Sequence, residues 1–240
     1  DCLRGMSLRG VELGLVAPEG GDLSSIALEV GAQYYPAPIA SGVSAPRTAI
    51  VRQAIEDFKP DVVHAHGHRA ALFARRADEK AGQRVVYTLH GIHVDKGILA
   101  PAKLLLERML MHRTAAFVVT CKADQVRALR LNIAQPDKIH VVYNGIPSPK
   151  SSVSGTFKNQ NGLHPDQQVI LTVARISKQK NLLGLLRIFE SAAQLSTQAG
   201  IEIPQLVMVC PGTPEDFEKL QADIAAHPFA NHITLLPQQA

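Results

Sequence analysis

Short apolar runs alternate with amphipathic segments along most of the chain, and this alternation constrains the fold more than any other feature. Runs of Val, Ile, Leu and Ala without helical spacing are typical of buried strands. They occupy residues 11–18, 61–66, 84–91, 115–120, 138–145, 168–174, 204–210 and 232–237. Strands that are apolar along their length and separated by helices indicate a parallel sheet covered on both faces. The sequence therefore predicts an α/β fold.

The amphipathic segments between these runs have the spacing of helices. In residues 45–60 the apolar side chains recur on one helical face, and Pro60 closes the segment. We expect residues 69–82 to form a helix that stops at Gly82, because glycine is common just after a last helical turn. Further helices are predicted within residues 100–113, 122–132, 180–196 and 214–227.

The composition changes once, after the fifth run. Residues 148–166 are rich in Ser, Pro, Gly, Asn and Lys and have no apolar periodicity, so they are predicted to be a linker. Residues 1–147 then form one Rossmann-like domain, incomplete at its start. Residues 167–240 form the first part of a second domain, cut short at its end, since so small a parallel sheet would leave apolar faces uncovered.

Polar and cationic residues follow the predicted strands, where open parallel sheets bind their ligands. After the run 168–174 a short loop carries Arg175, Lys178 and Lys180, and a helix begins near Asn181. Arg175 and Lys180 are expected to lie beside the free N–H groups of the helix start, and together they suit a diphosphate. The other interpretation is that these are solvated loop charges.

Three histidines alternate in "HAHGH", at His64, His66 and His68. One interpretation is a zinc site completed by His90 with His93 and Asp95 at the next strand end. The other is a hydrogen-bonded histidine at His64 within a buried strand, with His66 and His68 at a pocket edge. We favour a pocket without a metal, because an isolated His-x-His is common by chance.

The segment "TVARISKQKN" followed by "LLGLLRIF" resembles the phosphate-binding segment of family-4 glycosyltransferases, which have the two-Rossmann-domain GT-B fold. The segments "DVVHAHG", "VVYTLHG", "FVVTCKAD" and "KIHVVYNGI" are similar in type and order to first-domain strands of that family. "QLVMVCPGTPE" is similar to a glycine-bearing strand and loop of its nucleotide domain. The resemblance covers most of the chain in the correct order.

The resemblance implies a role for particular residues. The first domain would bind the acceptor and the second the sugar nucleotide, with the chemistry in the cleft between them. Arg175 and Lys180 would hold the donor diphosphate, and Gly212 would lie near the nucleotide. His90 would be the catalytic residue, orienting the donor sugar or binding a hydroxyl rather than serving as a general base. The acceptor side or cleft would be lined by His66, Gly67, Asn144 and Gly145.

Three departures accompany the resemblance. The glycine-rich loop of the family would lie before Asp1, and its paired-glutamate motif, with seven residues between the two, would lie beyond Ala240. Lys122 stands where serine is common in the family. We therefore expect the chain to be a fragment of a longer enzyme.

The implied activity is transfer of a sugar from a nucleotide diphosphate to a hydroxyl acceptor, with retention of configuration, in polysaccharide or cell-envelope synthesis. No metal or other cofactor is expected. Three alternatives remain open: a GT-B-fold sugar-nucleotide epimerase, a metal-dependent hydrolase using the "HAHGH" histidines, and a non-catalytic sugar-nucleotide-binding fragment.

Charge and composition narrow the partners. The net charge of +4 favours an anionic partner, but aromatic residues make up 5% and Trp is absent, so nucleic acid is not expected. The partners expected are a nucleotide sugar and a glycan or lipid-linked acceptor. Three separated cysteines suit a reducing cytoplasm.

Residues 100–113 carry Leu and Met on one face and basic residues around it. This pattern is compatible either with contact to the inner face of a membrane or with packing on the sheet.

Overall fold

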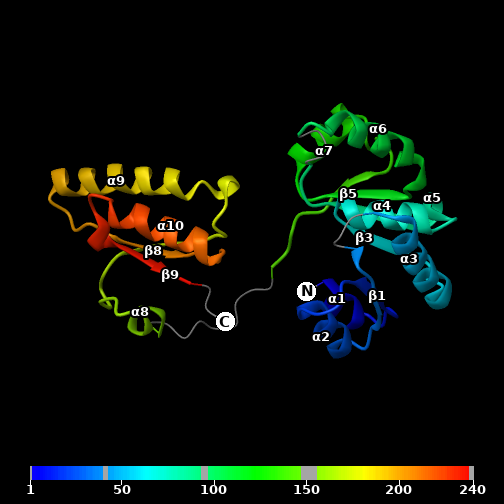
Figure 1. Ribbon diagram of the computed structural model, residues 1–240, viewed down its shortest axis with the longest axis horizontal. Coiled ribbons are helices and arrows are strands. Elements are labelled where there is room, and N and C mark those ends of the chain that lie inside the picture. The colour runs from blue at the N-terminus through cyan, green and yellow to red at the C-terminus, as the bar shows by residue number, and fades with distance from the viewer. Residues whose placement is uncertain (1, 40–42, 93–96, 147–155, 238–240) are drawn as a thin grey trace. The chain divides into compact units, whose positions relative to one another are not determined.

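The computed structural model of the protein describes residues 2–39, 43–92, 97–146 and 156–237. The chain divides into two compact units, Asp1–Pro147 and Ser148–Ala240, and Figure 1 shows the elements of each. Every strand pairing in the two units is parallel. The protein is therefore an α/β protein, as predicted.

The first unit contains two hydrogen-bonded sheets. A two-stranded sheet joins β1 (Gly14–Ala17) to β2 (Gln33–Pro36), and a four-stranded sheet has the order β3-β4-β5-β6. The strands of the second sheet are Val63–His66, Val85–Leu89, Ala116–Val119 and Ile139–Val141. The helices are α1 (Cys2–Ser7), α2 (Asp22–Glu29), α3 (Ala45–Phe58), α4 (His68–Ala77), α5 (Ala81–Arg84), α6 (Ala100–Leu110), η2 (Met111–Arg113) and α7 (Lys122–Arg130).

One face of the four-stranded sheet carries the main core of this unit. Val85, Tyr87, Phe117 and Val119 are buried there with apolar residues of α4, α5 and α7. Because the strand order follows the chain, right-handed crossovers bring α4, α6 and α7 to the same face. The alternate strand positions are half-buried or exposed apart from Thr88, as at His64, Val86, Val118 and His140. The predicted cover on both faces is therefore not found among the described residues.

The second unit is a three-stranded sheet of order β7-β8-β9, formed by Val169–Val173, Gln205–Val209 and Ile233–Leu236. Its helices are α8 (Thr156–Gln160), η3 (Lys178–Lys180), α9 (Leu182–Ala199), α10 (Pro214–Ala225) and η4 (Ala230–His232). Figure 1 shows α9 and α10 on the same side of the sheet, where their apolar faces cover Leu206 and Met208. The side chains of β7 are half-buried or exposed, and Val173 is 71% exposed.

The predicted end of a helix at Gly82 is wrong. α4 ends at Ala77, and Gly82 lies inside the separate α5. Asp78 breaks the helix because its carboxylate accepts from the Lys80 N–H and the Arg84 side chain. Gly82 is needed for another reason: a Cβ there would lie 2.8 Å from the carbonyl oxygen of His112.

Other elements were not predicted from the sequence. α1, α2 and β2 are short, and none of them has a long apolar repeat. α8 falls within the predicted linker 148–166, and there Lys158 Nζ donates to the carbonyl oxygens of Pro165 and Gln167 at 2.6 and 2.8 Å. Part of that segment therefore folds with the second unit.

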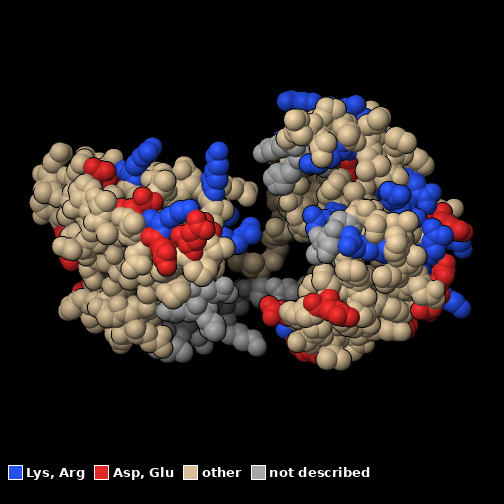
Figure 2. All heavy atoms as spheres, viewed as in Figure 1, with Lys and Arg blue, Asp and Glu red and all other residues tan. Residues whose placement is uncertain are grey.

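The surface carries charges of both signs. On the face drawn in Figure 2, Lys and Arg side chains are interspersed with Asp, Glu and uncharged residues. Among the described residues, no helix is both long and apolar enough to cross a bilayer.

Candidate functional site

In the first unit, histidines from two neighbouring strand ends come together. His66 is the last residue of β3, and His90 directly follows β4. The parallel register pairs His66 with Thr88, so the His90 ring reaches the His66 ring. His66 Nδ1 lies 3.0 Å from His90 Nε2, and the two rings are stacked at 5.3 Å between centroids. Two predicted site residues are therefore in direct contact.

His64 extends this row on the same side of β3. Its ring lies 4.2 Å from the His66 ring, and its Nε2 is 2.7 Å from the Thr88 hydroxyl oxygen. The predicted hydrogen bond is present and part-buried, but the predicted full burial is wrong, because His64 as a whole residue is exposed. β3 is an end strand of its sheet, so no hydrogen-bonded neighbour covers that edge in the described part of the chain.

The surroundings of this row favour the neutral form of His64 and His66. Partial burial and the neighbouring imidazoles of His64 and His90 lower the pKa of His66 to about 4. Partial burial and His90 also lower the pKa of His64. A hydrogen bond between the His66 and His90 rings needs one nitrogen with its proton and one without. Near neutral pH, His64 and His66 are therefore better suited to hydrogen bonding than to carrying charge.

Acid should destabilise the first unit through His66. Its folded pKa of about 4 lies below the unfolded value, so the unfolded chain binds the proton first and stability falls as pH drops from about 6.5 to about 4. His66→Gln should lose less stability over that range. Thermal unfolding of both proteins across this range measures the difference, and an identical pH dependence would contradict the assignment. Titration of the His66 ring followed by NMR gives the pKa directly.

Gly67 links this row to the start of α4. Its φ of 83° lies in the region that favours glycine, and its N–H donates to the Thr88 carbonyl oxygen at 2.9 Å. The turn lets the chain leave β3 at His66 and enter α4 at His68. Gly67 therefore shapes the predicted acceptor edge through its backbone.

In the second unit, Arg175, Lys178 and Lys180 lie on the exposed loop between β7 and α9. None of these three side chains has an ion-pair or hydrogen-bond partner within the described residues. The loop is held to the segment after β8, since Ala174 N–H donates to Val209 O at 3.1 Å and Ile176 N–H to Pro211 O at 2.9 Å. Three unpaired cations thus stand on a backbone anchored at the carboxyl edge of the sheet.

Gly212 lies against this same loop. A Cβ at Gly212 would approach Ile176 Cδ1 to 2.9 Å and its Cβ and Cγ1 to 3.1 Å. The structure therefore brings the predicted nucleotide residue next to the neighbour of Arg175. Only glycine lets the two loops approach this closely.

Gly212→Ala should push the Ile176 side chain away and cost about 1–3 kcal/mol in the free energy of unfolding of the second unit. Ile176→Val removes the nearest carbon atom, so it should recover part of that loss in the double variant. Urea unfolding of the four proteins measures the coupling. Strictly additive effects would show that Ile176 is not the group displaced.

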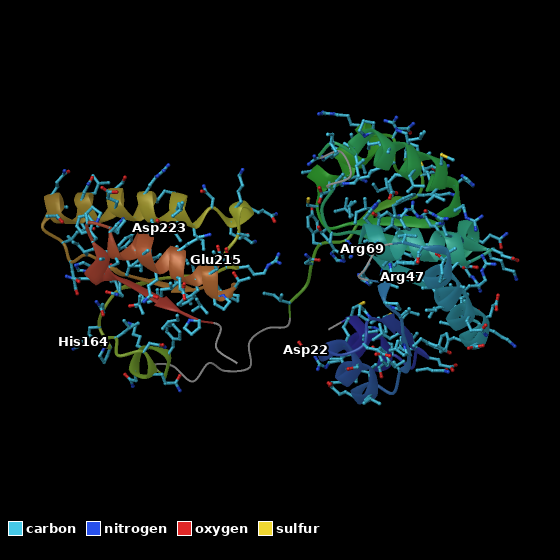
Figure 3. The ribbon with its side chains drawn as sticks, in the orientation of Figure 1. Asp22, Arg47, Arg69, His164, Glu215 and Asp223 are labelled. Carbon is cyan, nitrogen blue, oxygen red and sulfur yellow. The ribbon has the colours of Figure 1, made fainter. Side chains whose placement is uncertain are left out.

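The start of α10 differs electrostatically from the Arg175 loop. Thr213 caps α10 by accepting from the Asp216 N–H at 3.2 Å, and the first turn carries Glu215 and Asp216. Glu215 is labelled on α10 in Figure 3. These carboxylates oppose an anion at this helix start, so a diphosphate is better accommodated at the cations beside α9.

Other predicted residues lie apart from these clusters. Asn144 and Gly145 are exposed after β6, and no contact joins them to the histidine row within the described residues. His93 and Asp95 lie outside the described residues. In the part of the chain that the structure describes, no group of three or more His, Cys, Asp or Glu side chains is placed to hold a metal ion.

The helix α6 has a mixed environment. Leu104 packs against the core, while Leu105 and Met109 are 60% and 61% exposed. Arg108 donates to the Leu131 carbonyl oxygen, so this basic group is engaged within the protein. The predicted packing on the core is confirmed for part of the Leu/Met face.

A buried ionic cluster of His68, Arg75 and Glu107 was missed by sequence reasoning. Arg75 and Glu107 are 0% and 1% exposed and form a bidentate ion pair between α4 and α6. A signal was available: Arg75 lies among alanines of an apolar helix face, and Glu107 lies three residues from Leu104 and four from Met111. A charge at a core-facing position indicates a buried partner.

The model of Glycosyltransferase Family 4 matches residues 1–148, more than half of the chain. EpsD of Bacillus subtilis (strain 168), named as a glycosyltransferase, is 28% identical over 177 residues, 68% of this chain and 44% of that protein. The D-inositol 3-phosphate glycosyltransferase of Jonesia denitrificans is 25% identical over 199 residues, 74% of this chain and 45% of that protein. The chain thus spans less than half the length of these curated relatives.

Solved structures share the fold. The Anabaena protein HepE, solved with UDP-glucose, superposes with a TM-score of 0.72 at 16% identity, covering 100% of this chain and 65% of that one. This chain belongs to glycosyltransferase family 4, whose members have the GT-B fold.

Proposed function

We propose that this chain is part of an enzyme that transfers a sugar from a nucleotide diphosphate sugar to a hydroxyl acceptor. The observation that carries the proposal is the loop of Arg175, Lys178 and Lys180, cationic, unpaired within the described residues and packed against Gly212. A donor diphosphate is an anion, so it would supply the negative counter-charge for these cations. The first unit would hold the acceptor beside its histidine row.

The chemistry follows from the leaving group. The bond between the anomeric carbon and the diphosphate oxygen breaks and a bond to the acceptor oxygen forms, while the proton of the acceptor hydroxyl passes to the departing diphosphate. Arg175 and Lys180 would stabilise the negative charge that develops on the diphosphate. We expect no metal for this role, and turnover should persist in EDTA. His90 would orient the donor sugar, and retention of configuration is expected from the family resemblance.

The relatives suggest which substrates to try first. HepE binds UDP-glucose, and the Jonesia relative is named for an inositol phosphate acceptor. UDP-glucose is therefore the first donor to test. We place the reaction in polysaccharide or cell-envelope synthesis in the cytoplasm, at the inner face of the membrane where the acceptor is lipid-linked.

Calorimetric titration tests the donor assignment. The folded chain in EDTA is titrated with UDP, GDP and ADP and with their sugar conjugates, beside Arg175→Ala. Saturable binding of one nucleotide that is lost in the variant is the expected result. Absence of binding by the folded chain would contradict the proposal for this chain.

The same titration, with the products in each sample identified, separates the alternatives. A metal-dependent hydrolase using the histidine row would lose its metal ion, and therefore its activity, in EDTA. Binding of a diphosphate by the cationic loop would not change on chelation. A non-catalytic fragment would bind the sugar nucleotide without releasing free sugar or a transfer product. An epimerase would convert the donor to its stereoisomer with no acceptor present.

A further inference from the structure

His68 belongs to a buried ionic cluster that the proposed donor chemistry does not use. Arg75 Nη1 and Nη2 donate to Glu107 Oε2 and Oε1 at 2.9 and 3.0 Å, and Arg75 Nε donates to Ala71 O at 3.1 Å. The guanidinium also lies 5.1 Å from the centroid of the Tyr87 ring. These contacts hold Glu107 rigidly between α4 and α6.

The third member of the cluster is an imidazole. His68 Nδ1 lies 2.6 Å from Glu107 Oε1. Burial alone would raise the pKa of Glu107, but His68 and Arg75 outweigh it and hold that pKa below its usual value. An ionised carboxylate only accepts, so the proton of the contact is on Nδ1 of His68. Glu107 thereby selects one tautomer of the His68 ring.

The opposite nitrogen of His68 is left for a ligand. Arg75 already pairs with Glu107, and Nδ1 is the His68 nitrogen that faces Glu107, so Nε2 is the ring nitrogen left over. Nδ1 is buried and lies at ion-pair distance from Glu107 Oε1 but outside hydrogen-bond geometry, whereas the side chain as a whole is 34% exposed. No hydrogen bond to His68 Nε2 occurs within the residues that the structure describes. Nε2 is therefore the ring nitrogen available to a ligand.

The position of His68 suits a substrate contact. It is the first residue of α4, two residues beyond His66 at the carboxyl end of β3, and Arg69, labelled in Figure 3, follows it. Ligands of open parallel sheets bind beyond this edge. A carboxylate that orients an imidazole from one side, leaving the other nitrogen to the substrate, is a recurrent arrangement in enzymes.

We infer that His68 binds a hydroxyl group of the sugar or polyol acceptor through Nε2, and that Glu107 and Arg75 are the residues that position it. The inference rests on the proposed function, because it takes the hydroxyl acceptor from it. His68 belongs to the unit proposed to hold the acceptor, so the hydroxyl is assigned to the acceptor rather than to the nucleotide.

Two isosteric variants separate this role from a structural one. His68→Asn keeps an amide near the Nδ1 position, facing Glu107, and removes the Nε2 group. His68→Gln keeps an amide near the Nε2 position. If His68 only satisfied Glu107, the Asn variant would behave as wild type. If His68 binds the acceptor, the His68→Asn substitution should weaken sugar binding at least tenfold, and His68→Gln should weaken it less.

The experiment uses the folded chain with nitrogen-15-labelled histidine and two probes, methyl α-D-glucopyranoside and UDP. NMR at neutral pH should show the His68 proton on Nδ1, and the glucoside should shift the His68 Nε2 signal saturably. UDP affinity, measured by calorimetry, should be equal in wild type and His68→Asn. A proton on Nε2 instead, or an Nε2 signal unmoved by the glucoside, would overturn the inference.

The outcomes keep the two proposals distinct. UDP binding without any response of Nε2 to the glucoside would leave the proposed function intact and reject the role of His68. A response of Nε2 in a chain that binds no nucleotide would support the hydroxyl site and reject the donor assignment.

Discussion

Glu107→Ala should lower the free energy of unfolding of the first unit by about 3–5 kcal/mol, because it leaves a buried guanidinium without its counter-charge. Arg75 is 0% exposed, and both oxygens of Glu107 accept its hydrogen bonds. His68 Nδ1 loses its neighbour in the same variant. Urea unfolding followed by far-ultraviolet circular dichroism, with the first unit's transition resolved, measures the loss.

Two controls define that result. Arg4 and Glu29 form an ion pair at 2.6 Å on the exposed surface, so Glu29→Ala should change stability very little. Replacing both members of the buried pair, in Arg75→Leu with Glu107→Leu, should cost much less than Glu107→Ala because no uncompensated charge remains. Equal effects of Glu107→Ala and Glu29→Ala would contradict the assigned burial of the pair.

Arg175→Ala and Lys180→Ala should each reduce kcat/KM for sugar transfer by roughly 100-fold, equivalent to about 3 kcal/mol of transition-state stabilisation. Each substitution removes a cation proposed to stabilise the negative charge that develops on the departing diphosphate. The measurement is initial rates with the sugar nucleotide identified by calorimetry, in the full-length enzyme.

Arg187→Ala is the matched control for this pair. Arg187 is an exposed cation on α9, so its removal changes the net charge by the same amount without altering the loop. Its kcat/KM should stay close to wild type. Unchanged kcat/KM in both loop variants would remove the diphosphate assignment, and a loss in Arg187→Ala would indicate a general effect of charge.

Much of the fold was predictable because strand and helix patterns are local. The eight runs proposed as strands coincide with β1 and with β3 to β9. The elements that escaped prediction, such as α2 and β2, are short and depend on packing around Leu13 and Ala27 for their stability. The break of α4 at Asp78 depends on Arg84 and on Arg113, which donates to the Asp78 carbonyl oxygen from a distant part of the chain.

The candidate site divides in the same way. Residues at or just after strand ends, such as His66, His90 and Arg175, were predictable because the parallel strands of a sheet bring their carboxyl ends to one edge. Their neighbours were not predictable. The 3.0 Å contact between His66 and His90 depends on the register of β3 against β4, which the sequence does not state.

By itself, the sequence determined the alternation of strands and helices, the two-part organisation and the polar groups at the strand ends. These follow from periodicity and turn chemistry over a few residues. Only the tertiary structure decided that Glu107 would meet Arg75 and His68, and that Gly212 would lie against Ile176. The physical reason is that a buried charge or a close backbone approach is stable only with one particular partner, and that partner is set by how helices and loops pack.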